Sequence, residues 1–206
     1  MTNKKTDEFI RLLRAAINQK KSNLYQIPYQ DEQALYAVAV LLHENKNKPA
    51  CLFLQKQDFE KLYPVLNEAM EWSDQFKLIV SDDVLTNDKL RKAMPYETDT
   101  FFFEEHPTLQ ELSKISKNIH VVNLNENENY ESFLLVPNRL MFRYIDKEAF
   151  GCCLNVQSNP KERERQETLI KLFQNLNEKS KPYSPELIDK YTIDFLKLNN
   201  CQRTLE

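Results

Sequence analysis

Acidic side chains follow two predicted strands, and they are the residues whose types and spacing best fit metal binding or acid–base catalysis. Asp82 and Asp83 come directly after one apolar run, and Glu104-Glu105-His106 follows the run at 100–103. Ligands of open α/β sheets bind at the carboxyl ends of the strands, where carboxylates can hold a cation or act as a general base. Asp82, Asp83 and Glu105 are therefore candidate residues of a metal-dependent hydrolase or nuclease. The same residue types also occur as helix caps or in solvated loops, where they neither catalyse a reaction nor bind a metal.

Glycine is nearly absent, because Gly151 is the single glycine in 206 residues. Phosphate-binding loops need several glycines, since their backbone must turn tightly and approach the ligand closely. This composition excludes a G-x-G-x-x-G dinucleotide fingerprint, a Walker A loop and a G-x-S-x-G nucleophile elbow. We therefore expect no cofactor.

Histidines and cysteines form no recognisable metal or nucleophile motif. The three histidines lack the spacing of a zinc site, and no Cys-x-x-Cys pair occurs. Cys152 and Cys153 are neighbours in an apolar run, so a strand would direct them to opposite faces and away from a shared metal ion. We interpret both as small buried hydrophobic residues, and we assign no catalytic residue.

The charge balance does not support nucleic-acid binding. The chain has 28 Lys and Arg against 31 Asp and Glu, for a net charge of −3. Basic residues gather locally in the last third, but glutamates alternate with the arginines of its predicted helix, which is typical of a solvated, salt-bridged face.

The sequence favours a cytoplasmic protein without a membrane partner. No apolar segment follows the first residues as in a secretory signal. The longest apolar stretch, 37–42, is far shorter than the roughly 20 residues that span a bilayer.

The elements that must position these residues alternate between helices and strands over the first 124 residues. Apolar periodicity and capping residues predict helices at 6–20, 31–43, 58–71, 86–94 and 107–116. Apolar runs between them predict strands at 23–27, 49–54, 76–80, 100–103 and 119–124. Strands that are separated by helices indicate a mostly parallel sheet.

The pattern changes in the last third of the chain. Three closely spaced runs at 131–136, 139–145 and 150–156 predict an antiparallel meander. Asn159-Pro160 then begins an amphipathic helix. We therefore expect a single α/β domain over residues 1–206, with a mixed sheet that combines N-terminal βα alternation with a C-terminal antiparallel meander. Helices should cover both faces, and residues 183–206 should form a helical appendage.

The segment 130–143 reads Tyr-Glu-Ser-Phe-Leu-Leu-Val-Pro-Asn-Arg-Leu-Met-Phe-Arg. It looks like the signature strand of the phospholipase D-like superfamily and its partner, and the resemblance extends over residues 130–176. Phe150-Gly-Cys-Cys-Leu-Asn155 looks like the glycine-to-asparagine strand, and the charged helix after Asn159-Pro160 is also similar. The rest of the chain matches the family only in the alternation of its elements.

The residues that catalyse the reaction of that family are missing. Family catalysis needs a histidine nucleophile, a lysine two residues later and a downstream aspartate, and H-x-K occurs nowhere in this chain. Tyr130 and Ser132 stand at the histidine and lysine places, and Pro137 stands near the aspartate place. The glycine-to-asparagine segment is one residue too long. The resemblance thus implies a catalytically inactive copy, similar to related domains that act as sensors, regulatory modules or accessory domains.

The leading hypothesis is a non-enzymatic binding or regulatory module on a phospholipase D-like scaffold. Its candidate binding residues are Tyr130, Ser132, Arg139, Arg143 and Asn155. One alternative is the metal-dependent hydrolase or nuclease with strand-end carboxylates. Another is a partner-directed effector or interaction protein. The expected partner is a protein or a small molecule of unidentified chemistry, and the sequence leaves a homodimer open.

Overall fold

A computed structural model describes residues 4–19, 23–28, 33–59, 61–62, 66, 75–85, 118–124, 128, 130–146 and 149–184. The longer helices are α1 (Lys4–Ile17), α2 (Gln33–His43) and α6 (Pro160–Lys179), and the 3₁₀ turns are η1 (Asp82–Leu85) and η2 (Val156–Ser158). The strands are β1 (Asn23–Pro28), β2 (Ala50–Leu54), β3 (Phe76–Ser81), β4 (Ile119–Val122), β5 (Phe133–Val136), β6 (Leu140–Asp146), β7 (Ala149–Leu154) and β8 (Lys181–Pro182).

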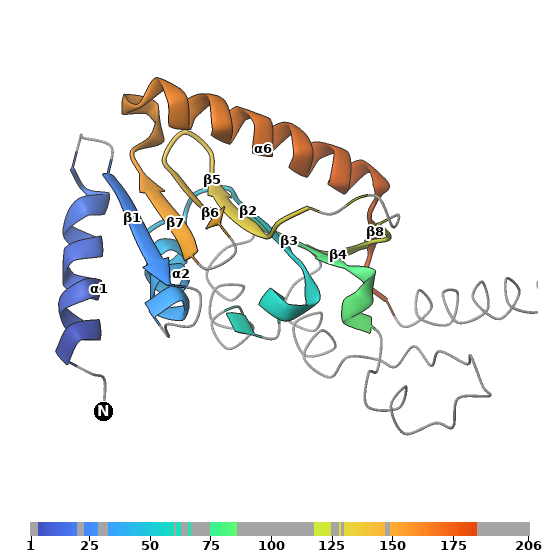
Figure 1. The fold of residues 1–206 in the computed structure, drawn as a ribbon. Helices are drawn as coiled ribbons and strands as arrows, with labels where there is room; N and C mark the ends of the chain where they lie inside the picture. The colour runs from blue at the N-terminus through green and yellow to red at the C-terminus, as the bar shows by residue number, and fades with distance from the viewer. Residues whose placement is uncertain are drawn as a thin grey trace, which may run out of the picture.

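These strands form one sheet in the order β1-β7-β6-β5-β2-β3-β4-β8 (Figure 1). β2, β3 and β4 are parallel neighbours, as expected for strands joined by crossovers. β5, β6 and β7 follow one another as antiparallel neighbours, and β1 and β8 add antiparallel edges. The expected mixed sheet with an antiparallel meander is confirmed.

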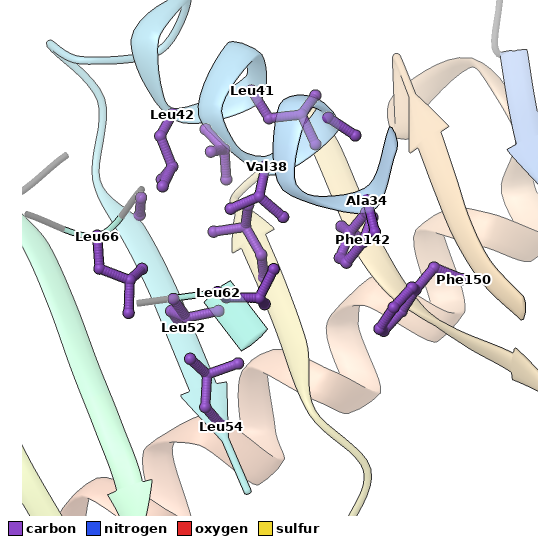
Figure 2. Close-up of a cluster of buried hydrophobic side chains, with 14 of the residues drawn as sticks. Ala34, Val38, Leu41, Leu42, Leu52, Leu54, Leu62, Leu66, Phe142 and Phe150 are labelled. Atoms are coloured by element: carbon purple, nitrogen blue, oxygen red, sulfur yellow. The ribbon is translucent and has the colours of Figure 1, made fainter. Parts of the chain in front are cut away.

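Helices cover both faces of the sheet, also as expected. α6 lies across one face, and α2 lies on the other (Figure 1). Figure 2 shows apolar side chains of α2 directed at the sheet, where they meet buried residues of the strands and of the segment after β2, including Leu52, Leu54, Leu62, Phe142 and Phe150. We call the buried apolar side chains on this face of the sheet the α2-side cluster. Under α6, the α6-side cluster includes Phe53, Ile79, Phe133, Cys153 and Phe173.

The start of α6 is fixed by its capping residues. Asn159 accepts hydrogen bonds at its side chain from the backbone N–H groups of Lys161 and Glu162, and Pro160 occupies the first helical position. The first turn of a helix leaves backbone N–H donors unpaired. The Asn159 side chain satisfies two of them, and Pro160 has no N–H group to satisfy. The predicted helix start at Asn159-Pro160 is therefore confirmed.

The single glycine is explained by a close side-chain approach. Gly151 lies in β7 without a positive φ, so no turn requires it. A Cβ atom at this position would lie 2.6 Å from Cγ1 of Ile145 in β6. The two neighbouring cysteines behave as predicted, because Cys152 is buried in the α2-side cluster and Cys153 in the α6-side cluster. Both are free thiols.

Element boundaries differ from the predictions by a few residues. α1 begins at Lys4 rather than at residue 6, and β4 ends at Val122 rather than at 124. The helices expected at 86–94 and 107–116 and the strand expected at 100–103 lie outside the described residues. The appendage expected at 183–206 does so too, apart from Tyr183 and Ser184. None of the described helices combines the length and apolar character needed to cross a bilayer.

Candidate functional site

Ser132 is enclosed in a buried hydrogen-bonded cluster. Its Oγ donates to Oδ2 of Asp58 at 2.5 Å and accepts from the backbone N–H of Gln55 at 3.0 Å. The hydroxyl of Tyr144 donates to the other oxygen of Asp58 at 2.6 Å. Asp58 is 0% exposed and Ser132 is 3% exposed. We name Asp58, Ser132 and Tyr144 the buried triad.

The elements around Ser132 account for this cluster. Ser132 lies just before β5, and β5 pairs with β2, which ends directly before Gln55. Asp58 stands in the first helical turn after β2, where the positive end of the helix dipole favours a carboxylate. Tyr144 comes from β6 on the other side of β5. Two segments, 74 and 86 residues further along the chain, therefore converge on the Asp58 carboxylate.

Tyr130 points away from the buried triad. Its ring packs on the α6-side cluster, and its hydroxyl donates to Glu128 at 3.3 Å. Glu128 also pairs with Lys179 at the end of α6, at 2.5 Å. Only the Tyr130 carbonyl approaches the same loop, because it accepts a hydrogen bond from the Gln55 side chain at 2.6 Å. Tyr130 and Ser132 therefore present no shared surface to a ligand.

Asn155 lies at the opposite end of the meander from Ser132. β7 runs antiparallel to β6, so Leu154 pairs with Leu140, near the β5–β6 turn. Ser132 instead precedes Phe133, at the far end of the hairpin. The Asn155 side chain donates to the carbonyls of Ala16 and Gln19 at the end of α1. The structure therefore does not bring Asn155 together with Tyr130 and Ser132.

Arg139 and Arg143, the two candidate binding arginines, lie in different surroundings. Arg143 donates to the Tyr144 carbonyl at 2.6 Å and lies 3.9 Å from a carboxylate oxygen of Glu162, which is 4% exposed. Glu162 pairs with Arg165 as well, at 2.5 Å, so Arg143 belongs to an ionic contact between β6 and α6. Arg139 lies in the β5–β6 turn, where its carbonyl accepts from the Val156 N–H at 3.1 Å.

A polar hollow opens at this turn. It has a volume of about 550 Å³ and is lined by Asn138, Gln157, Pro160, Arg163, Glu164 and Glu167. We call this depression the hairpin-end hollow. Arg139 and Asn155 lie next to it in the chain, beside Asn138 and η2.

A buried glutamine holds the rim of the hollow in place. Gln166 is 2% exposed and accepts from the Asn138 N–H at 2.8 Å. Its amide also donates to the Leu140 carbonyl at 2.7 Å and the Val136 carbonyl at 3.3 Å. Asn138 itself has φ 63°, a left-handed conformation that asparagine tolerates better than most residues. The helix and the turn are thus tied together by these hydrogen bonds.

The strand-end carboxylates form a smaller polar group. Asp82 accepts a hydrogen bond from the Asn123 amide at 2.7 Å, and Ser81 donates to Asp83. Burial, and secondarily the charge of Asp83, raises the pKa of Asp82 to about 6. Glu105, the third residue of the metal hypothesis, lies outside the described residues. Within the described part of the chain, no group of three or more His, Cys, Asp or Glu could hold a metal ion.

Sequence reasoning missed Asp58, Tyr144 and Gln166. Asp58 lies 74 residues from Ser132, and Tyr144 lies 86 residues from Asp58. No local sequence pattern predicts contacts between residues so far apart in the chain. The one available sequence signal for Asp58 was its place as a polar residue at the start of the helix predicted for 58–71. Gln166 sits on the inward side of an amphipathic helix, and a polar residue there needs a partner when it is buried.

Comparison with known proteins gives likeness only at the level of structure. No family model and no curated protein matches the chain. Nuc, a phospholipase D family member from Salmonella typhimurium, is similar with a TM-score of 0.47 and 11% identity, over 79% of this chain and 99% of that chain.

An archaeal chromatin protein, TrmBL2, is similar with a TM-score of 0.49 and 10% identity. The likeness covers 87% of this chain and 62% of TrmBL2, so the chain spans less than two thirds of that protein. TrmBL2 is described as having a novel mode of DNA binding. At these identities both likenesses concern the fold alone.

Proposed function

We propose that this chain is a non-enzymatic binding module that holds a polar ligand in the hairpin-end hollow. The buried triad is the observation that carries the proposal. At the place where the phospholipase D-like resemblance puts a catalytic pair, Ser132 is 3% exposed and hydrogen-bonded to Asp58, and Tyr130 points to the other face. A nucleophile must reach its substrate, and Ser132 is too enclosed for that, while Tyr130 points away from it.

The hairpin-end hollow has the chemistry of a binding surface rather than of a reaction centre. Asn138 and Gln157 offer side-chain amides, and Arg163, Glu164 and Glu167 offer charges of both signs. Gln157 donates to Asn138 at 2.7 Å, so these amides are oriented with respect to each other. We infer a ligand with several hydrogen-bond donors and acceptors, because such groups can pair with the amides and charges that line the hollow.

The rigidity of the hollow supports the same proposal. The Gln166 contacts fix the turn on one side, and the Asn159 cap fixes the first turn of α6 on the other. A site that is organised before binding loses less conformational entropy when the ligand arrives. The surface is therefore suited to recognition without a large change of shape.

Ligand titration followed by amide NMR tests the binding proposal. Amino acids, dipeptides, nucleotides and sugar phosphates serve as probes of polar ligand classes. We expect at least one class to shift the Asn138, Gln157 and Arg163 amides, and Arg163→Ala to weaken that binding. Lys171→Ala is the matched control, because Lys171 is exposed on the same helix but does not line the hollow. Shifts that gather only around Asp82 and Asn123 would contradict the proposal.

A further inference from the structure

The charged side chains that line the hairpin-end hollow differ from other charges of α6 in having no ionic partner. Glu162 pairs with Arg165 one turn away, at 2.5 Å. Among the residues that the structure describes, Arg163, Glu164 and Glu167 form no ion pair. Each of these three is exposed, and each lines the hollow. Their charges are therefore open to a ligand.

Acidic charge predominates in this lining. One arginine stands against two glutamates, so the charged side chains sum to one net negative charge. Glu164 and Glu167 lie three residues apart on one helix, which makes them neighbours on its surface, and like charges there repel each other. A cation beside both carboxylates would relieve this repulsion. The hollow therefore favours a ligand with positive groups and disfavours one with several negative charges.

The start of α6 does not offset this acidity with a phosphate site. The N-terminus of a helix binds phosphate through backbone N–H groups that lack helical partners. Here Pro160 has no N–H group, and the Asn159 side chain accepts from the N–H groups of Lys161 and Glu162. The N–H group of Arg163 donates to the Asn159 carbonyl at 2.9 Å. These first residues of α6 keep no backbone donor for a phosphate, which argues against nucleotides and sugar phosphates.

The hollow can nevertheless hold a carboxylate beside a cation. The Arg163 guanidinium can pair with a carboxylate through two parallel N–H donors. Gln157 donates to the side-chain oxygen of Asn138 at 2.7 Å. In the described part of the chain, the Asn138 amide N–H groups and the Gln157 side-chain oxygen then have no partner. The first can donate to a carboxylate, and the second can accept from an ammonium group.

We propose that the hairpin-end hollow binds a free α-amino acid with a cationic side chain. The inference rests on the proposed function, because it names the ligand class of the same hollow. The α-carboxylate pairs with Arg163, and the α-ammonium and the side-chain cation pair with Glu164 and Glu167. Such a molecule carries one net positive charge, which balances the one net negative charge of the lining. Each charge of the ligand thus meets an opposite charge of the protein.

Amide NMR titration with a charge series of amino acids tests this assignment. L-lysine, L-norleucine and L-glutamate share their α-groups but carry cationic, neutral and anionic side chains. We expect L-lysine to shift the Asn138, Gln157 and Arg163 amides with a dissociation constant about fivefold lower than that of L-norleucine, and L-glutamate to bind more weakly than both. Raising the salt concentration should weaken L-lysine binding, because the charges are exposed and therefore screened.

Substitution of the two glutamates tests the cation contacts. Glu164→Gln combined with Glu167→Gln keeps the size of both side chains but removes their charges, so the dissociation constant of L-lysine should rise at least about fivefold. The matched control combines Glu8→Gln with Glu178→Gln. It removes the same number of charges at exposed positions outside the hollow, and its affinity for L-lysine should match the wild-type value.

Arg163→Gln tests the carboxylate contact against a second ligand. Cadaverine is lysine without its carboxylate, so it has no group for Arg163 to bind and is repelled by the arginine charge. The substitution should therefore weaken L-lysine binding but leave cadaverine binding unchanged or tighter. Thermal melts should show that all variants fold, since the substituted positions are exposed.

The binding function and the ligand class fail in different ways. If none of these ligands, nor any nucleotide or sugar phosphate, shifts the amides of the hollow, the proposed function falls and this inference falls with it. If L-glutamate or a nucleotide shifts those amides at lower concentration than L-lysine, the hollow remains a binding site but the amino-acid assignment is overturned. An L-lysine affinity that is unchanged in the double glutamate variant overturns the assignment as well.

Discussion

Asp58 is fully buried, and each of its carboxylate oxygens accepts a hydrogen bond from a side-chain hydroxyl. A buried carboxylate costs several kcal/mol unless it is paired or hydrogen-bonded, so Ser132 and Tyr144 offset that cost. Sequence reasoning named Ser132 as a candidate binding residue, because the phospholipase D-like resemblance expects a lysine at its place. It could not show what Ser132 contacts, because its partners Gln55 and Asp58 lie in the segment after β2, 77 and 74 residues away in the chain. The buried triad is therefore explained as a structural feature.

Ser132→Ala tests this structural role. The change leaves an oxygen of Asp58 and the Gln55 N–H without their buried partner, so we expect the free energy of unfolding to fall by about 2 to 3 kcal/mol. Urea denaturation measures the difference. Ser158→Ala is the control, because its exposed hydroxyl bonds only a local carbonyl, and it should cost about 0.5 kcal/mol. Equal losses of unfolding free energy in the two variants would contradict a structural role of the buried triad beyond that of an exposed hydrogen bond.

At the scale of elements, the parallel strands β3 and β4 bring their carboxyl ends together. The apolar runs predicted both strands, and the parallel register places Ser81 opposite Val122. Asp82 and Asn123 follow these residues and form a hydrogen bond, as expected for side chains at one sheet edge. The sequence could not predict how deeply Asp82 would be buried, because burial depends on neighbouring segments. That burial now gives Asp82 a raised pKa.

Asp82→Asn should change the pH dependence of stability. In the folded chain the pKa of Asp82 is raised from 3.8 to about 6, so the folded state holds its proton more tightly than the unfolded state. The associated stability is complete below about pH 4 and is lost as the pH rises through 6. At pH 7 we expect the variant to be more stable by about 1 kcal/mol, a value reduced for partial exposure.

Thermal or urea unfolding at several pH values measures the Asp82 effect. The gain should vanish below about pH 4, where Asp82 is protonated in both states and differs little from asparagine. This convergence is an internal control, because a general effect of the substitution would persist at every pH. A stability gain that is the same at pH 4 and pH 7 contradicts the assignment.

For the whole molecule, the alternation of apolar runs predicted the mixed sheet, the meander and the helices on both faces. It did not predict the strand order, because pairing of β1 with β7 joins segments more than 120 residues apart. This pairing makes β1 an edge strand. The meander also places Asn155 at the opposite end from Ser132. The candidate binding residues of the sequence therefore separate: Ser132 lies in the buried triad, Tyr130 on the α6-side cluster, and Arg143 in its ionic contact. Arg139 and Asn155 lie beside the hairpin-end hollow.

Phosphodiester turnover by the purified chain tests the central claim most directly. Bis(4-nitrophenyl) phosphate and single-stranded DNA are suitable substrates, with Mg²⁺ or Mn²⁺ present and with a chelator. The account predicts no hydrolysis above the rate of a buffer blank, because Ser132 is buried in its hydrogen bonds to Asp58 and Gln55. Hydrolysis that co-purifies with the chain and is lost in folded Ser132→Ala would contradict it. Metal-dependent hydrolysis lost in Asp82→Asn would contradict it in favour of the strand-end carboxylates.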